Sequence, residues 1–232
     1  MSNIDPTEIE KFNAIADKWW DLDGEFAPLH KMNPYRVQYI EDCASGLFGK
    51  NILDVGSGGG ILAEALAQRG GQVTGLEPAP QSVEVAMHHA QESALSINYH
   101  QGLIEDFAPE HFETFDIVTS LEMLEHVPDP ASILQAAIST LKPGGYLFVS
   151  TLNRTLRSYL LGIVAAEYVL NLVPKGTHEH DKFLKPSEVI GMIEQNNCKV
   201  KKANGIHFNP LTQKFSINND LAVNYILCAQ KL

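Results

Sequence analysis

The chain has 232 residues, of which 44% are hydrophobic and 19% charged, as in an ordinary globular protein with a substantial core. Its 28 Asp and Glu outnumber 17 Lys and Arg, so the net charge is -11. Nucleic-acid binders need a concentrated basic surface, and this balance argues against such a partner. Three scattered cysteines and a start without the pattern of a secretion signal lead us to expect a cytoplasmic protein.

Two helices are expected before residue 49. In the first, residues 5–20, Asp5 is a suitable cap, Pro6 suits the first helical position, and Glu8 can complete a capping box with Asp5. The second should begin at Asn33 as cap, with Pro34 following. The loop between these helices carries two aromatic side chains that look exposed, Trp20 and Phe26.

After residue 50, short apolar runs alternate with helical stretches. The strands are predicted at 51–55, 72–77, 97–102, 115–121 and 145–152, and the helices at 61–70, 79–94 and 130–145. This alternation predicts parallel strands joined by right-handed crossovers, with helices on both faces of the sheet. The tail adds a helix at 185–196 and strands at 198–206 and 221–232, which should pair as a hairpin.

The expected architecture is one α/β domain over residues 1–232. It comprises a helical cap (1–48), a cofactor-binding core (49–151), an apolar insert (152–185), and a C-terminal helix and hairpin (186–232). The sheet should have about seven strands, mostly parallel, with an antiparallel C-terminal strand at a mixed edge.

The most specific signal is "LDVGSGGGILAEAL", in which glycines follow a strand and open a helix. Glycines there let a ligand approach the backbone closely. Glu77 ends the next strand, 21 residues beyond Gly56, where a carboxylate can accept both hydroxyls of an adenosine ribose. A dinucleotide fingerprint needs a small residue where this chain has Ile61, and Asp54 would repel a pyrophosphate. A cationic nucleoside cofactor suits the acidic loop better.

The spacing of Asp54, Gly56, Gly58 and Gly60, D-x-G-x-G-x-G, resembles that of the class I S-adenosylmethionine-dependent methyltransferases, which have a Rossmann-like fold. Further blocks widen the likeness: "KWWDLDGEFAPLHKMNPYR", "LEMLEHVPDP", "STLNRT" and "AEYVLNLVPKGTHEHDKFLKP". Together they resemble the ubiquinone-biosynthesis O-methyltransferase family over nearly the whole chain. The resemblance implies methyl transfer to phenolic hydroxyls of polyprenyl catechol and 3-demethylubiquinol precursors.

The resemblance also implies the cofactor contacts. These are Arg36, Gly56, Glu77 and Leu121, to which the motif adds Asp54 and Gly58. Arg36 should pair with the carboxylate of the methionine part. Two positions depart from the family pattern: Glu77 stands where Asp is usual, and Ser57 where Cys is frequent.

The stretch "SLEMLEHVPDP" places Glu122, Glu125 and His126 at the end of a predicted buried strand. Carboxylate and imidazole ligands suit magnesium, manganese or zinc, and the resemblance implies a divalent-metal site in this E-x-x-E-H motif. His126 could instead be a general base that removes the phenolic proton without a metal. A third interpretation is a structural loop whose acidic groups favour the next helix N-terminus. A second cluster, His178 and His180, fits a solvated loop.

The apolar segment 156–174 is too short and too charged to cross a bilayer, since Arg157 and Glu167 interrupt it and Pro174 ends it. It fits either a lid helix on the sheet or an amphipathic contact with the membrane surface. A polyprenyl substrate favours peripheral contact at the inner face of the membrane. It also suggests a place in a ubiquinone-biosynthesis complex.

Three other functions fit parts of the pattern. The first is a methyltransferase for a soluble small phenol, or a C-methylating relative. The second is a cofactor-binding module without catalysis. The third is a dinucleotide oxidoreductase, which Ile61 disfavours.

Overall fold

The computed structural model describes residues 3–159, 180–209 and 212–232. The helices are α1 (Pro6–Ala14), α2 (Ala27–Ala44), α3 (Ile61–Gln68), α4 (Pro80–Glu92), α5 (Ile104–Phe107), α6 (Pro130–Thr140), α7 (Leu156–Ser158) and α8 (Pro186–Glu194). Short 3-10 turns cover Ala16–Lys18 (η1), Ala108–Glu110 (η2), Leu124–His126 (η3) and His180–Lys182 (η5). The strands are β1 (Asn51–Val55), β2 (Gln72–Glu77), β3 (Asn98–Gln101), β4 (Phe115–Leu121), β5 (Leu141–Leu152), β6 (Cys198–Asn209), β7 (Lys214–Asn218) and β8 (Asn224–Lys231).

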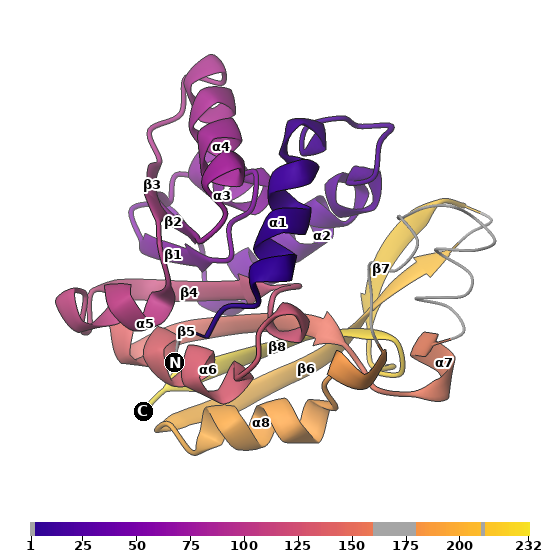
Figure 1. Ribbon diagram of the computed structural model, residues 1–232. Helices are drawn as coiled ribbons and strands as arrows, with labels where there is room; N and C mark the ends of the chain where they lie inside the picture. The colour runs from indigo at the N-terminus through magenta and orange to yellow at the C-terminus, as the bar shows by residue number, and fades with distance from the viewer. Residues whose placement is uncertain (1–2, 160–179, 210–211) are drawn as a thin grey trace.

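One sheet organises the described residues, with the strand order β3-β2-β1-β4-β5-β8-β6-β7 (Figure 1). The first five strands are parallel. β8 runs antiparallel to β5, and β6 is antiparallel to both β8 and β7. The predicted α/β class and antiparallel C-terminal strand are confirmed. The strand count is eight and not about seven, because β7 lies in the segment that was expected to be a plain loop.

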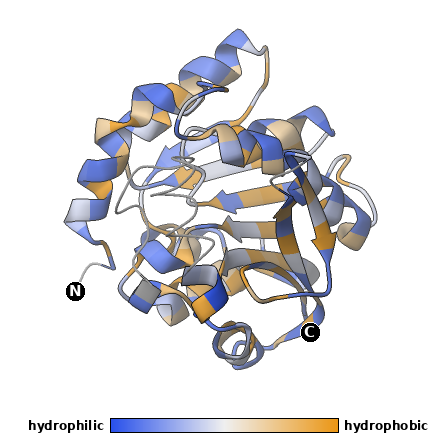
Figure 2. Cartoon of the chain, turned by 90° about the vertical axis from the view of Figure 1, so that its right-hand side faces the viewer, coloured by the Kyte–Doolittle hydropathy of each residue, from blue (hydrophilic) through white to orange (hydrophobic). Residues whose placement is uncertain are grey.

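Apolar side chains alternate between the two faces of the central strands. In β1, Leu53 packs with α6 and α8 residues on one face, while Ile52 packs with α2 and α3 residues on the other. β4 is buried along nearly its whole length, as expected for a central parallel strand covered on both faces. Figure 2 shows the corresponding pattern in the helices, where hydrophilic and hydrophobic residues alternate along each helix.

Helix α2 begins at Ala27, six residues before the predicted cap Asn33. Pro28 occupies the first turn, where a proline is tolerated, and Pro34 lies inside the helix. Pro34 lacks the backbone N–H that would bond to the preceding turn. The burial of Met32, Asn33 and Arg36 in the same helix outweighs that local cost.

Candidate active site

A cavity of about 760 Å³ lies at the carboxyl ends of β1, β2 and β4. Ligands of open α/β sheets bind at such ends, where the strand order reverses. Every site residue predicted from the sequence lines this cavity: Arg36, Asp54, Gly56, Gly58, Glu77, Leu121, Glu122, Glu125 and His126. The fold therefore brings the predicted cofactor residues and the acidic-histidine loop (Glu122–His126) to one cavity.

The glycine loop between β1 and α3 needs glycine for two physical reasons. Gly56 and Gly58 have φ angles of 75° and 52°, which side chains disfavour. A Cβ atom on Gly56 would lie 2.6 Å from Cγ of Met123, and one on Gly58 would lie 2.5 Å from Cη2 of Trp19. Backbone conformation and close packing thus both require glycine here.

Glu77 is held in place by the backbone around the loop. Its Oε2 accepts from the Gly58 N–H at 3.0 Å, and its Oε1 accepts from the Ala79 N–H at 2.9 Å. Each carboxylate oxygen keeps a second lone pair for a ribose hydroxyl. Burial raises the pKa of Glu77 to about 7, although both backbone donors favour the ionised form.

Arg36 and Asp54 present opposite charges to the same cavity. Arg36 is 4% exposed. Its Nη2 donates to Asn33 Oδ1 at 3.2 Å, and its Nε is buried with no hydrogen-bond partner in the described part of the chain. Asp54 Oδ1 accepts from Thr119 Oγ1 at 2.7 Å, and burial raises the pKa of Asp54 to about 6. A ligand that carries both a carboxylate and an amine fits this pair. The unpartnered Arg36 Nε, the glycine loop and Glu77 together fit the predicted cofactor.

The raised pKa of Glu77 predicts a pH dependence of cofactor binding. Below about pH 7 the free protein holds a proton on Glu77. This proton must leave before the carboxylate can accept from both backbone N–H groups and both ribose hydroxyls. We expect the affinity for S-adenosylhomocysteine to rise by about twentyfold between pH 6 and pH 8, with about tenfold from Glu77 and about twofold from Asp54, whose pKa is about 6. Isothermal titration calorimetry across this range measures it. In Glu77→Gln only the Asp54 share should remain, so the rise in affinity should shrink to about twofold. A variant with the same rise as wild type would assign the titration to another group.

The N-terminal segment covers the glycine loop. The Trp19 indole packs against Gly58 and Gly59, stacks on Phe26 with ring centroids 3.8 Å apart, and donates from Nε1 to Ser82 Oγ at 3.1 Å. Trp20 Nε1 donates to Gly59 O at 2.8 Å. Phe26 is 8% exposed, so the expectation that it is exposed was wrong. Stacking on Trp19 explains its burial.

The acidic-histidine loop begins with a residue in an unusual conformation and ends in the 3-10 turn η3. Glu122 has a φ of 55°, and its carboxylate accepts from Ser150 Oγ at 2.5 Å and from Asn224 Nδ2 at 2.9 Å. Glu125 Oε2 accepts from Thr151 Oγ1 at 2.7 Å. Burial and the Glu122 charge raise the pKa of Glu125 to about 7.

His126 bonds to a residue that was predicted to have another role. Its Nδ1 lies 2.7 Å from Glu8 Oε2, while Glu8 Oε1 accepts from Lys11 Nζ at 2.7 Å. The predicted capping box with Asp5 was wrong, since both Glu8 oxygens are engaged elsewhere. The His126 hydrogen bond lowers the pKa of Glu8 to about 2. Burial alone would lower the pKa of His126, but the Glu8 hydrogen bond and the nearby carboxylates raise it.

The predicted metal ligands do not converge in this structure. Among the described residues, no group of three or more His, Cys, Asp or Glu side chains is placed to hold a metal ion. Glu122, Glu125 and His126 each bond to a different protein partner. Cation binding would require these hydrogen bonds to change, and the metal site stays a prediction.

Several polar partners at the site were missed from the sequence: Glu8, Ser150, Thr151 and Asn224. Glu8 lies 118 positions from His126, and Asn224 lies 102 positions from Glu122. No spacing rule links residues so far apart. Ser150 and Thr151 alone had a signal, since they lie near the carboxyl end of the predicted strand 145–152, and ligands of such sheets bind at that end of the strands.

The second histidine cluster and the apolar segment fall largely outside the described residues. The structure does not describe His178, the side chain of His180, or most of segment 156–174. Within the described ranges, no helix is long and apolar enough to span a membrane.

A methyltransferase domain family matches residues 30–203. The chain is 53% identical over 230 residues to the ubiquinone biosynthesis O-methyltransferase of Actinobacillus pleuropneumoniae serotype 7 (strain AP76), covering 97% of this chain and 98% of that protein. It is 51% identical over 229 residues to the protein of the same name in Vibrio vulnificus (strain YJ016), with 99% and 97% coverage.

Solved structures share the fold at lower sequence identity. The magnesium protoporphyrin IX methyltransferase of Synechocystis PCC 6803 with bound SAH superposes with a TM-score of 0.73 at 18% identity, covering 98% of this chain and 100% of that one. A SAM-dependent methyltransferase from Thermotoga maritima, a possible histamine N-methyltransferase, gives a TM-score of 0.69 at 17% identity, with 97% and 99% coverage. These likenesses show the fold alone.

Proposed function

The chain belongs to the ubiquinone biosynthesis O-methyltransferase family, and from this premise we propose that it methylates phenolic hydroxyls of polyprenyl catechol and 3-demethylubiquinol precursors. Its methyl donor is S-adenosylmethionine. The observation that carries the proposal is the shared cavity, which joins Arg36, Glu77 and the glycine loop to the acidic-histidine loop. Donor and acceptor sites in one cavity are what an in-line transfer needs.

When bound, the cofactor supplies a methyl group on a positively charged sulfur. The chain's residues bind and orient the two reactants: Glu77 for the ribose hydroxyls, Arg36 for a carboxylate, and Leu121 as the apolar wall at the end of β4. A phenol has a pKa of about 10, so its proton must leave before the oxygen can attack efficiently. We assign this proton to the acidic-histidine loop, where Glu125 and His126 line the cavity.

A polyprenyl chain needs an apolar path to the cavity. The side chains Ile206, Phe208 and Phe215 of the β6–β7 hairpin line one part of it, and the Phe208 and Phe215 rings lie 5.0 Å apart. Such a wall supports an acceptor with a hydrocarbon tail.

Contact with the inner face of the membrane through residues 156–174 belongs to the same proposal, as does a place in a ubiquinone-biosynthesis complex. At the described start of this segment, Leu156 is 73% exposed and Tyr159 is 41% exposed. Exposed apolar and aromatic side chains suit an interfacial contact.

The test is transfer of a labelled methyl group to a short-chain polyprenyl catechol and to a short-chain demethylubiquinol. It is run first with EDTA and then with magnesium or zinc restored. We expect turnover on both acceptors. Turnover that is lost with chelator and recovered with metal would support a cation held by Glu122, Glu125 and His126; turnover indifferent to chelator would remove the metal from the proposal and leave His126 as base.

Other outcomes select the rival functions. Equal activity on unprenylated phenols would point to a soluble small acceptor. Cofactor binding without turnover on any phenol would point to a module without catalysis.

A further inference from the structure

Asn224, the first residue of β8, contacts the acidic-histidine loop from another part of the sheet. Its Nδ2 lies 2.9 Å from Glu122 Oε2. An ionised carboxylate only accepts hydrogen bonds, so the amide must turn its NH₂ group toward Glu122. That orientation leaves Oδ1 of Asn224 buried and without a hydrogen-bond partner among the described residues, in a side chain that lines the cavity.

Glu122 is held firmly enough to serve as a fixed reference for Asn224. Its backbone N–H donates to Ser150 O at 2.9 Å, and its Oε1 accepts from Ser150 Oγ. The positive φ of Glu122 is a sparsely populated conformation that persists only when the surroundings determine it, and such residues cluster at functional sites. Asn224 supplies the remaining hydrogen bond to this carboxylate.

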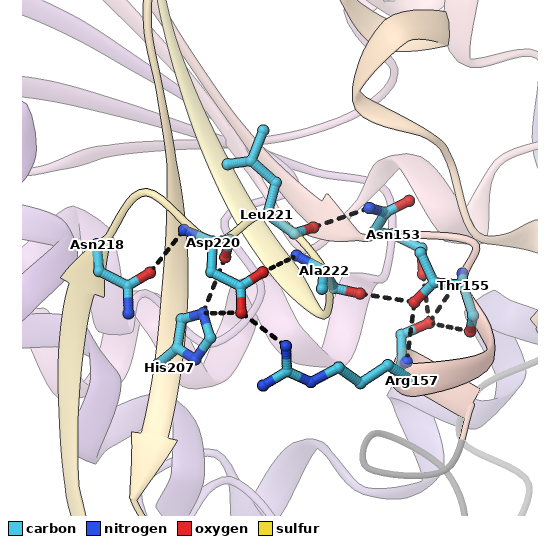
Figure 3. A network of polar contacts seen from close by, with 9 residues as sticks. Asn153, Thr155, Arg157, His207, Asn218, Asp220, Leu221 and Ala222 are labelled. Carbon is cyan, nitrogen blue, oxygen red and sulfur yellow. Dashed lines mark hydrogen bonds and ion pairs between the residues drawn. The ribbon is translucent and has the colours of Figure 1, made fainter.

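The loop that leads into Asn224 is fastened to the chain that leaves β5 (Figure 3). Three side chains bind it: Asn153 Nδ2 donates to Leu221 O (2.8 Å), Thr155 Oγ1 to Ala222 O (2.6 Å), and Arg157 Nη1 to Asp220 Oδ2 (2.7 Å). The Asn153 backbone N–H also donates to Val223 O at 2.7 Å. These contacts fix the backbone immediately before Asn224, so its amide is preorganised.

A buried acceptor without a donor is costly, and native structures rarely leave one without a reason. The reaction offers a donor of the right kind, because a catechol carries a second hydroxyl next to the one that is methylated. We infer that Asn224 Oδ1 accepts a hydrogen bond from this second hydroxyl while Nδ2 holds Glu122. Asn224 is then a specificity-determining residue for acceptors with two adjacent hydroxyls, and this inference rests on the proposed function.

The experiment compares two short-chain polyprenyl acceptors, a catechol and its analogue with hydrogen in place of the second hydroxyl. Wild type should have a KM about tenfold lower for the catechol. Asn224→Ala and Asn224→Leu should bring the two KM values together, while the affinity for S-adenosylhomocysteine stays as in wild type. Leu has the same number of side-chain heavy atoms as Asn and branches at the same carbon, so the two variants test the site with different side-chain shapes and guard against one of them failing to fold.

Ser150→Ala is the matched control, because it removes the other side-chain hydrogen bond to Glu122 and leaves Asn224 Oδ1 in place. It should lower kcat on both acceptors by the same factor and keep the KM ratio. Asn224 variants that keep the wild-type KM ratio overturn the inference, and so does a wild type with equal KM values for the two acceptors. Wild type that turns over neither acceptor refutes the proposed function instead.

Discussion

Replacing Glu77 by glutamine is expected to weaken binding of S-adenosylhomocysteine by about 10- to 100-fold. The Glu77 carboxylate accepts two backbone N–H groups, from Gly58 and Ala79, and has lone pairs left for two ribose hydroxyls. Glutamine has one acceptor oxygen, so its NH₂ group would face a backbone donor inside a buried site. One hydrogen bond would be lost and two donors would oppose each other. Isothermal titration calorimetry measures the change.

The matched control is Glu77→Asp, which keeps both acceptor oxygens on a side chain shorter by one methylene. It should retain affinity within about fivefold of wild type, because the ionised group and its acceptor capacity are unchanged. If the Glu77→Gln variant binds S-adenosylhomocysteine as tightly as wild type does, Glu77 contacts no ribose hydroxyl. If the aspartate variant loses as much affinity as glutamine, reach rather than charge governs this position.

His126→Ala is expected to lower kcat by about 100-fold or more, with the affinity for S-adenosylhomocysteine unchanged. The imidazole lines the cavity and is fixed at Nδ1 by Glu8, so its other ring nitrogen is the one that remains for the acceptor. Truncation removes that group whether it accepts the phenolic proton itself or binds a cation. Labelled-methyl transfer at saturating acceptor and cofactor measures kcat.

His88→Ala serves as the control for His126, since His88 is an exposed histidine of α4 that does not line the cavity. It should leave kcat as in wild type. The chelator assay then separates the two roles of His126: a metal role requires Glu122→Ala and Glu125→Ala to weaken the response to added cation as His126→Ala does. If the kcat of His126→Ala stays within about threefold of wild type, the acidic-histidine loop has a structural role and His126 takes no part in the reaction.

Local patterns predicted the core of the fold. Strands 51–55, 72–77 and 115–121 were placed with the bounds that the structure shows, because each is an apolar run closed by glycine, acidic or helix-starting residues. The cofactor residues followed from the same local order. Neighbouring parallel strands end at the same edge of the sheet. The glycine loop after one strand therefore lies beside the acidic residue that ends the next.

Elements whose signals compete locally were predicted less well. Asn33 and Pro34 together read as a helix start, yet α2 begins at Ala27 because burial of one helix face outweighs the missing backbone hydrogen bond. Strand β7 was missed because its exposure alternates at the edge of the sheet, where pairing with β6 alone defines it.

By itself, the sequence determined the alternation of strands and helices from β1 to β5, the glycine loop, and the charged groups offered to a cofactor. Only the tertiary structure decided the partners of those groups. Glu8 fits a capping box locally, but the residue is only 7% exposed and its carboxylate bonds to His126, across 118 positions. Glu122 likewise depends on Asn224 across 102 positions. Burial removes water as the alternative partner, so the folded neighbour, and not the sequence neighbour, decides what each buried polar group does.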